Sequence, residues 1–415
     1  MKTSIVILTY NKLEYTKGCI ESIRQFTRPG SYEIIVVDNN STDDTVEWLR
    51  QQKDIRIIFN SENRGFPAGC NQGIGVADGD DILLLNNDII VTHNWLDNLS
   101  GCLHSADDIG AVGPVTNFAC YYQTVTCKYH TVEEMHAFAR KFNASNPALW
   151  ERRLKLIGFC MLIRKSVIDR IGLLDERFSP GHFEDDDYST RMRREGYKLI
   201  LCQDTFIHHW GSVSFKDDHE KHVELGAENA RKFEGKWGFN SEYSSYIRHE
   251  IIECMDSAAD SPIKVLEVGC GCGATLLKIK HDYKNAELYA IEQNENSATD
   301  ARMFAEIGSI DVENGEIDYP DNFFDYIIFA DVLEHLYDPW KVLRKFRSCL
   351  SGSGVILASI PNTMHFSLIR DLINGNWTYQ DAGLLDRTHL RFFTADEITK
   401  TWRSLKDLVS WEGRT

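Results

Sequence analysis

The feature that most limits the fold of this 415-residue chain is an alternation of short apolar runs with amphipathic helical stretches. In the first half, helical patterns over Glu14–Phe26 and Asp44–Lys53 separate the first three runs. This alternation predicts a parallel sheet covered by helices. The runs expected to form strands are Ser4–Leu8, Glu33–Val37, Ile55–Phe59, Ile82–Leu85, Gly110–Pro114 and Phe159–Arg164.

The alternation restarts after Asp260-Ser261-Pro262, which follows a polar, helix-prone stretch from about residue 220 to 259. A single core usually stops growing at about 250 residues, so two domains are expected. We predict two α/β domains, residues 1–238 and 263–415, with a helical linker over 239–262. The strands expected in the second are Lys264–Val268, Glu287–Ile291, Asp325–Phe329 and Gly354–Ile360, with a helix around Pro339–Leu350.

Composition narrows the class of protein. The formal net charge of −17 argues against a chain that binds nucleic acid through its phosphates. Two basic clusters, Arg152–Lys155 and Arg191–Arg194, are interpreted as solvated helix faces. No run reaches the roughly 18 apolar residues of a membrane span, and no secretory signal pattern begins the chain. A cytoplasmic location is expected, with peripheral contact at the inner face of the membrane left open.

Polar residues follow three of the predicted strands in the first half. Thr9 and Asn11 follow the first, Asp38 to Ser41 the second, and Asn86 to Asp88 the fourth. Ligands of doubly wound sheets bind beyond the carboxyl ends of the strands, so these side chains are expected to converge on one. Each group alone is also compatible with a turn or a helix cap.

At these positions the sequence resembles the family 2 glycosyltransferases, which have the GT-A nucleotide-sugar fold. The resemblance covers about residues 2–238 and follows the family's motif order. The matching segments are Val6–Asn11, Val36–Asp43, Asn63–Asn71, Leu83–Asp88, Phe183–Tyr188 and His208–Ser212.

The resemblance implies roles for particular residues. Asp88 ends the family's Asp-x-Asp metal motif, whose first acid is Asn86 here, and His209 is a second ligand for Mg²⁺ or Mn²⁺; His208 is expected to pack or cap. Asp185 is the expected general base and Glu184 the second choice, whereas Asp187 is interpreted as a structural acid. The segment 184–187 is also compatible with an acidic helix start. The expected contacts of the nucleotide-sugar donor are Thr9, Asn11, Asp38, Asn63, Gly65 and Asn87.

The second half carries a glycine-rich loop, Gly269-Cys270-Gly271-Cys272-Gly273, after a strand and before a helix. The loop alone is equally compatible with a dinucleotide site. Together with Phe324–Ile328 and Asp331–Leu336, it resembles class I S-adenosylmethionine-dependent methyltransferases. The resemblance implies that Glu267, Gly269, Gly271 and Glu292 contact the methyl donor and that Asp311 and Val312 flank its adenine. His335 and His389 are candidate bases, and His335 is equally compatible with a helix-capping or packing role.

Too few residues follow the helix expected over Ala395–Leu405 to form the last two strands of that fold, so a truncated or degenerate methyltransferase domain is expected. The eleven cysteines are expected to be reduced, and Cys270 and Cys272 to be loop residues and not zinc ligands.

The leading hypothesis is therefore an inverting, metal-dependent glycosyltransferase with a C-terminal methyltransferase-like domain. It would use a UDP-, dTDP- or GDP-linked sugar and a glycan or lipid-linked glycan of the bacterial surface, with residues 118–150 shaping the acceptor site. One alternative reduces the C-terminal domain to a binding or docking module. Another makes both domains non-catalytic scaffolds. A nucleotidyltransferase is disfavoured, because no glycine lies between Thr9 and Tyr15.

Overall fold

The computed structural model describes residues 1–211 and 219–404. The chain divides into two compact units, Met1–Ser241 and Glu242–Thr415. Most of the segment 239–262, expected from the sequence to be a linker, therefore packs with the second unit. It contains the short helices α9 (Ser241–Ser244) and α10 (His249–Ile252).

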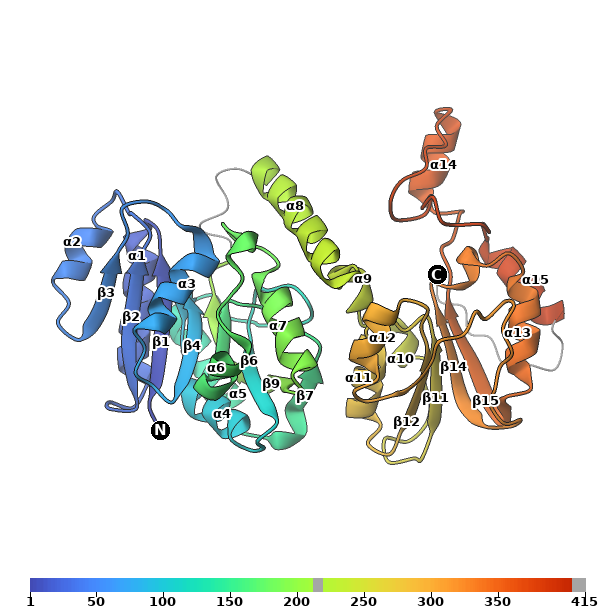
Figure 1. Cartoon of the computed structure of the whole chain (residues 1–415), viewed down its shortest axis with the longest axis horizontal. Coiled ribbons are helices and arrows are strands. Elements are labelled where there is room, and N and C mark those ends of the chain that lie inside the picture. Colours follow the sequence, from blue (N-terminus) through green and yellow to red (C-terminus); the bar gives the residue numbers. More distant parts are fainter. Residues whose placement is uncertain (212–218, 405–415) are drawn as a thin grey trace. The chain divides into compact units, whose positions relative to one another are not determined.

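The first unit is built on an eight-stranded sheet in the order β3-β2-β1-β4-β8-β6-β9-β7 (Figure 1). Strands β1 to β4 are parallel to one another, whereas β8 runs antiparallel to both β4 and β6. The strands are β1 (Thr3–Thr9), β2 (Tyr32–Asp38), β3 (Ile55–Phe59), β4 (Asp81–Asn86), β6 (Ile109–Val115), β7 (Trp150–Arg153), β8 (Cys160–Arg164) and β9 (Lys198–Phe206). A separate antiparallel pair joins β5 (Ile89–Ile90) to β10 (His208–His209).

Alternate side chains of these strands enter two hydrophobic clusters, one on each face of the sheet. Helices α1, α2 and α4 cover one cluster, and α3, α5, α6 and α7 cover the other. The helices of the unit are α1 (Leu13–Phe26), α2 (Thr45–Arg50), α3 (Gly65–Gly75), α4 (Trp95–Leu103), α5 (Val132–Phe142), α6 (Lys165–Ile171), α7 (Glu184–Arg194) and α8 (His219–Trp237), with 3-10 turns over Pro147–Leu149 and Glu176–Phe178.

The sheet register places the polar strand ends next to one another. Thr9 lies opposite Asp38 across β1 and β2, and Leu8 lies opposite Asn86 across β1 and β4. The register therefore brings these strand ends together at one edge of the sheet.

The expected strands of both units are present, with ends that differ by at most one residue, except that the strand expected over Gly354–Ile360 begins at Leu350. The interpretation of Arg152–Lys155 as a solvated helix face is wrong. Arg152 and Arg153 lie on β7, and Arg153 and Lys155 are buried. Arg153 pairs with Glu151 and Lys155 pairs with Asp186, so buried carboxylates compensate both charges. In Arg191–Arg194, which is helical, Arg193 is also buried.

The second unit contains a five-stranded parallel sheet in the order β13-β12-β11-β14-β15. Its strands are β11 (Lys264–Val268), β12 (Glu287–Ile291), β13 (Glu306–Gly308), β14 (Phe324–Ala330) and β15 (Leu350–Ser359). Its further helices are α11 (Ala274–Asp282), α12 (Glu295–Ala301), the 3-10 turn η3 (Leu333–His335), α13 (Pro339–Arg347), α14 (Phe366–Ile373) and α15 (Ala395–Ser404). Among the described residues, β15 is the last strand of this sheet in chain order.

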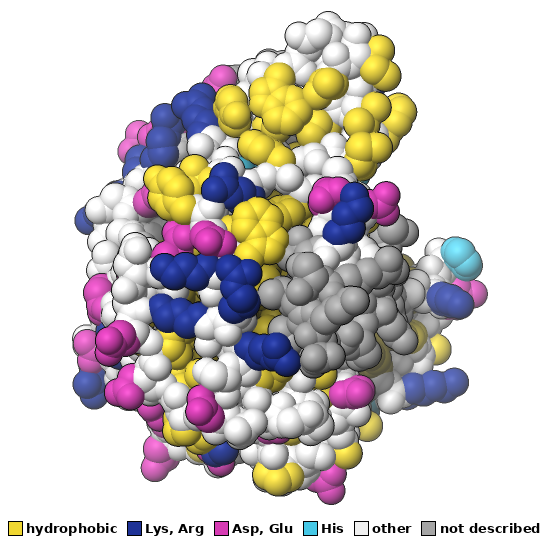
Figure 2. Space-filling model, turned by 90° about the vertical axis from the view of Figure 1, so that its right-hand side faces the viewer, with side chains coloured by type: hydrophobic (Ala, Val, Ile, Leu, Met, Phe, Trp, Pro, Cys, Tyr) yellow, Lys and Arg dark blue, Asp and Glu magenta, His cyan; other side chains and the backbone are white. Residues whose placement is uncertain are grey.

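Helix α14 and the segment after it project from the body of the second unit (Figure 1). Figure 2 shows hydrophobic side chains gathered on this projection. Phe366 is 74% exposed and Ile373 is 81% exposed, with Trp377 and Tyr379 also exposed nearby in the sequence. Among the described helices, none is both long and apolar enough to cross a membrane.

Candidate functional site

Thr9 and Asn87 are brought together at the end of β1. Both side chains are buried and meet at Thr16 of α1: the Thr16 hydroxyl lies 2.7 Å from that of Thr9 and accepts a 2.9 Å hydrogen bond from the Asn87 amide. The Asn87 amide also lies 3.3 Å from the Thr9 hydroxyl. These contacts fix the loop that carries Asp88.

Asp38 ends β2 with a buried carboxyl group. One oxygen, Oδ2, accepts a hydrogen bond from the backbone N–H of Ser41 at 3.1 Å. The other, Oδ1, is buried and has no hydrogen-bond partner among the described residues. Buried polar atoms are rarely left unpaired, so this oxygen fits a group that a ligand supplies.

Asn11 joins the first two strand ends. Its backbone N–H donates to the Ser41 hydroxyl at 2.7 Å, and its Oδ1 accepts from the Thr42 N–H at 2.7 Å. The residue has a φ of 55°, in the left-handed region that asparagine tolerates better than most residues. The loops after β1 and β2 therefore form one connected rim.

Asn63 and Gly65 complete that rim at the start of α3. The Asn63 Oδ1 accepts from Gly65 N–H at 3.0 Å and from the side-chain amide of Asn39 at 3.2 Å. Gly65 has a φ of 80°, and an added Cβ would lie 2.6 Å from the Cα of Pro180, so only glycine fits here.

Asp88 and His209 face each other across the β5–β10 pair. The Asp88 Oδ1 lies 3.2 Å from the His209 Nε2, and each side chain is about a tenth exposed. The His209 Nδ1 lies 2.7 Å from the carbonyl oxygen of Phe118, so the Nδ1–H donates to it. In the neutral ring this leaves the Nε2 lone pair beside a carboxylate oxygen. Two ligand atoms so placed fit a divalent cation, and the carbonyl fixes the tautomer as second-shell partners of metal-binding histidines do.

The neighbouring His208 is occupied differently. Its Nδ1 lies 2.7 Å from the Tyr129 hydroxyl, and its ring packs against Trp210 with centroids 4.7 Å apart. Burial, followed by the charge of His209, lowers the pKa of His208 to about 4. These contacts favour His209 over His208 as a ligand.

Asp185 and Glu184 begin α7. Asp185 is partly exposed, and its Oδ2 accepts from the Gly158 N–H at 2.9 Å. Burial in the acidic cluster, followed by the charge of Asp186, raises the pKa of Asp185 to about 7. Glu184 is buried, and burial with the charge of Asp185 raises its pKa well above the usual value. The more accessible of the two is thus a carboxyl that gains and loses a proton near neutral pH.

The next two acids of α7 are held by cations. Asp186 accepts from Lys155 Nζ at 2.6 Å and from the Ser241 hydroxyl. Although burial opposes ionisation, the Lys155 ammonium lowers the pKa of Asp186 below its usual value. Asp187 accepts from Arg191 at 3.0 Å and also pairs with Lys236. Asp187 therefore has the contacts of a structural acid.

One short segment connects the acids of α7 with the Asp88–His209 pair. Gly158 donates to Asp185, and the next residue, Phe159, stacks on the His209 ring with centroids 5.4 Å apart. The Phe159 carbonyl accepts from the Asn86 N–H at 2.9 Å. The two groups that the sequence predicts as metal site and base thus line the same edge of the sheet.

In the second unit, the glycine-rich loop lies between β11 and α11. Gly269, Gly271 and Gly273 have φ values of 74°, 55° and 82°. The Glu292 Oε2 accepts from the Gly271 N–H at 2.8 Å, so the acid that ends β12 holds the loop. Glu267 is buried with an unpartnered Oε2 among the described residues, and burial raises its pKa to about 8. A loop and acids so placed fit a nucleoside ligand.

The other two predicted residues of this site lie farther along the chain. Val312 is buried in the core cluster of the unit. Asp311 is exposed, and its Oδ2 accepts from the Asn314 side chain at 2.8 Å; that bond holds the pKa of Asp311 below its usual value.

With this geometry in place, similarity to known proteins can be assessed. Residues 4–172 match the model of glycosyl transferase family 2, and residues 239–405 match that of a methyltransferase domain. The chain is 30% identical over 218 residues to the glycosyltransferase GlyG of Streptococcus pneumoniae, across 48% of this chain and 68% of GlyG. The chain belongs to glycosyl transferase family 2. The same chain carries a second domain, of the methyltransferase type.

Two further relatives cover different parts. The O-antigen biosynthesis protein RfbC of Myxococcus xanthus is 28% identical over 229 residues, across 52% of this chain and 18% of RfbC. The probable S-adenosylmethionine-dependent methyltransferase Rv3030 of Mycobacterium tuberculosis is 26% identical over 157 residues, across 37% of this chain and 52% of Rv3030. The chain thus spans about half or less of the length of these two relatives.

Sequence reasoning missed several residues that shape the site. Lys155, read as part of a solvated face, neutralises Asp186. Phe159, read only as the start of a strand, stacks on His209. Its place directly before the buried run of β8 was the available signal, but its partner lies 50 residues later in the sequence.

Proposed function

We propose that the first unit transfers a sugar from a nucleotide-diphosphate donor to a hydroxyl group of a bacterial surface glycan, with inversion at the anomeric carbon and with a divalent metal ion. The observation that carries the proposal is the Asp88–His209 pair, in which an imidazole Nε2 and a carboxylate oxygen lie 3.2 Å apart. We keep the sequence-based boundaries, 1–238 for this domain and 263–415 for the methyltransferase domain, as part of the proposal.

Asp88 and His209 would hold Mg²⁺ or Mn²⁺. The donor set fits, because it offers one hard carboxylate oxygen and one imidazole nitrogen whose ring is oriented by the Phe118 carbonyl. When bound, the cation supplies neutralisation of the negative charge on the diphosphate leaving group.

The rim of strand ends would hold the nucleotide. Asp38 offers the unpartnered Oδ1 to a base or ribose hydrogen-bond donor. Asn11, Asn63 and Gly65 keep the loops on either side of it in place, while Thr9 and Asn87 fix the loop that carries Asp88.

Asp185 would act as the general base. The acceptor hydroxyl gives its proton to the Asp185 carboxylate while its oxygen bonds to the anomeric carbon, and the bond from that carbon to the diphosphate oxygen breaks. A single displacement of this kind inverts the configuration. A carboxyl with a pKa of about 7 suits the role, because it is ionised in part at neutral pH and still basic. Glu184, which is buried beside it, is the second candidate for the base.

The second unit would bind S-adenosylmethionine through Gly269, Gly271 and Glu292, with Glu267 below the loop and Asp311 and Val312 near the adenine. When bound, this cofactor supplies an electrophilic methyl group. The named function of Rv3030 supports this assignment. The alternative is a domain that only binds or docks. Such a domain would not transfer a methyl group.

The acceptor and the location are proposed on less direct grounds. The named role of RfbC in O-antigen biosynthesis supports a glycan or lipid-linked glycan acceptor. The exposed apolar side chains of α14 support peripheral contact with the inner face of a membrane. Sedimentation with anionic vesicles tests that contact, and unchanged sedimentation of a Phe366→Ser, Ile373→Ser variant would count against it.

Donor hydrolysis tests the proposed function. UDP-, dTDP-, GDP- and CDP-sugars are incubated with the full chain, with and without Mn²⁺, and release of the nucleotide is followed. We expect release from one donor class that depends on Mn²⁺ and falls in the His209→Ala variant. Absence of both release and nucleotide-diphosphate binding with every donor would overturn the proposal and favour a scaffold.

A further inference from the structure

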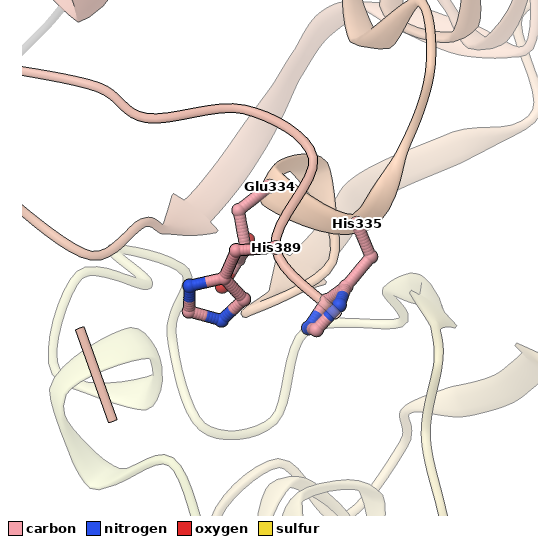
Figure 3. Close-up of side chains that lie close together, drawn as sticks. All are labelled: Glu334, His335 and His389. Carbon is pink, nitrogen blue, oxygen red and sulfur yellow. The ribbon is translucent and has the colours of Figure 1, made fainter. Parts of the chain in front are cut away.

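The second unit contains a cluster of three metal-binding side chains outside the loop proposed for the methyl donor. Glu334 and His335 lie on η3, directly after β14, and His389 lies on the loop before α15. One ligand atom from each lies within 4.8 Å of the others. Figure 3 shows the carboxylate and the two imidazoles side by side although His389 is distant in the sequence.

The protein holds this cluster in place through backbone contacts. The Glu334 carbonyl accepts hydrogen bonds from the N–H groups of Leu390 and Arg391 at 2.8 and 2.9 Å. The Asp386 carboxylate accepts from the N–H and the hydroxyl of Thr388, which fixes the loop just before His389. The meeting of the three side chains is therefore a consequence of loop structure and not of a chance rotamer.

Both imidazoles direct one nitrogen to the backbone. The His335 Nδ1 lies 3.3 Å from the Thr388 carbonyl oxygen, and the His389 Nδ1 lies 3.3 Å from the Leu384 carbonyl oxygen. Because carbonyls only accept, each Nδ1 carries the hydrogen and each Nε2 keeps a lone pair. Carbonyl partners of this kind orient histidines that ligate metals. The ring centroids are 4.9 Å apart.

Glu334 gives the strongest indication of a ligand. Its side chain is 1% exposed, and neither carboxylate oxygen has a hydrogen-bond partner among the described residues. The nearby cation Arg248 pairs instead with Asp331, at 2.7 Å. A buried carboxylate without a partner is costly unless a cation compensates it.

From this arrangement we propose that Glu334, His335 and His389 bind a divalent transition-metal ion. Two imidazole nitrogens and one carboxylate oxygen favour ions such as Zn²⁺, Co²⁺, Fe²⁺ or Mn²⁺ over Ca²⁺, which prefers oxygen ligands alone. Three protein ligands leave coordination positions for an oxygen atom of a substrate.

The site borders the proposed methyl-donor loop. A Cβ added at Gly269 would lie 2.8 Å from the side chain of Val332, which is two residues before Glu334. A role for the metal in methyl transfer rests on the proposed function, whereas metal binding does not. In that role the metal-bound hydroxyl of an acceptor sugar loses its proton to water, and its oxygen bonds to the methyl carbon. The carbon–sulfur bond of S-adenosylmethionine breaks, and the sulfur keeps the electron pair.

Metal binding is measured on the full chain in a His209→Ala background, which removes the proposed ligand of the first unit. Metal-free protein is dialysed against Co²⁺, bound metal is quantified, and the visible spectrum is recorded. We expect one bound equivalent with weak d–d bands and without the strong thiolate charge-transfer bands of a cysteine site. Displacement by Zn²⁺ should abolish the spectrum.

Adding His389→Ala, or the near-isosteric Glu334→Gln, should remove that equivalent or weaken its binding by at least about tenfold, while a control His365→Ala keeps it. His365 is exposed and caps α14.

Circular dichroism of the metal-free variants shows whether they fold, and Zn²⁺ should raise the Tm of the background but not that of the Glu334→Gln variant. Equal Co²⁺ stoichiometry, affinity and spectra in all variants would overturn the metal site. S-adenosylmethionine binding, measured separately, tests the proposed function, so the two can fail independently.

Discussion

Both units gather acids and histidines beside their sheets, but the charges of the acids are compensated differently. In the first unit, protein cations neutralise part of the acidic cluster, as Lys155 does for Asp186. In the second, Glu334 is buried without a side-chain partner among the described residues. His209 lies on a paired strand, whereas His335 and His389 lie on a turn and a loop. The comparison teaches that the protein itself compensates Asp186 and Asp187 of α7, whereas no protein cation pairs with Glu334 among the described residues.

The largest expected effect is on the chemical step in the first unit. The Asp185→Asn variant should lower kcat for sugar transfer by about 10³-fold, because the base is lost, while donor binding stays unchanged. Initial rates and calorimetric titration of the donor separate the two. The exposed Asp169→Asn serves as the control. Full activity of Asp185→Asn would remove Asp185 from its role.

The next effect tests how the first unit compensates its acids. Lys155→Met should lower the free energy of unfolding by about 3–5 kcal/mol, because it leaves Asp186 buried and unpaired. The exposed pair Lys198–Asp108 provides the matched control, since Lys198→Met should cost less than about 1 kcal/mol. Denaturant unfolding measures both. Similar losses for the two variants would contradict the assigned burial of the Lys155 charge.

The adjacent histidines sharpen the comparison further. His209→Ala should lower the apparent affinity for Mn²⁺, measured by sugar transfer, by about 10- to 100-fold. His208→Ala should leave the Mn²⁺ dependence unchanged, because the Nδ1 of that ring is paired with the Tyr129 hydroxyl and the ring packs against Trp210. Titration of activity with Mn²⁺ gives both values. A larger effect from His208→Ala would reverse the ligand assignment.

The smallest effect is on pH dependence. Asp185 must be ionised to accept a proton, and burial raises its pKa to about 7. The value of kcat/KM should therefore be level above that pH and fall about tenfold per unit below it. A profile measured between pH 5 and 9 tests this. A level profile down to pH 5 would show that no base with a raised pKa controls the reaction.

Much of the fold could be predicted from the sequence, because apolar runs and turn residues mark β1 to β4 and β11, β12 and β14 almost to the residue. The polar strand ends followed from the topology, since parallel strands bring Thr9, Asp38 and Asn86 to one edge. β7 was missed because Arg152 and Arg153 do not resemble strand residues. Arg153 is tolerated there because the buried Glu151 pairs with it.

The second-unit cluster could be predicted only in part. The sequence singled out His335 and His389 as separate candidate bases. Their meeting depends on the hydrogen bonds from Leu390 and Arg391 to the Glu334 carbonyl, which connect segments more than 50 residues apart. Nothing local in the sequence specifies such a contact, and the burial of Glu334 follows from it.

The most direct test of the central claim, that each unit holds its own ligand site, is calorimetric titration of the full chain with a nucleoside diphosphate plus Mn²⁺ and, separately, with S-adenosylhomocysteine. His209→Ala should weaken only the first ligand and Glu292→Gln only the second, each by about tenfold or more. If the unaltered protein binds neither ligand, or if either substitution weakens both equally, the account is contradicted.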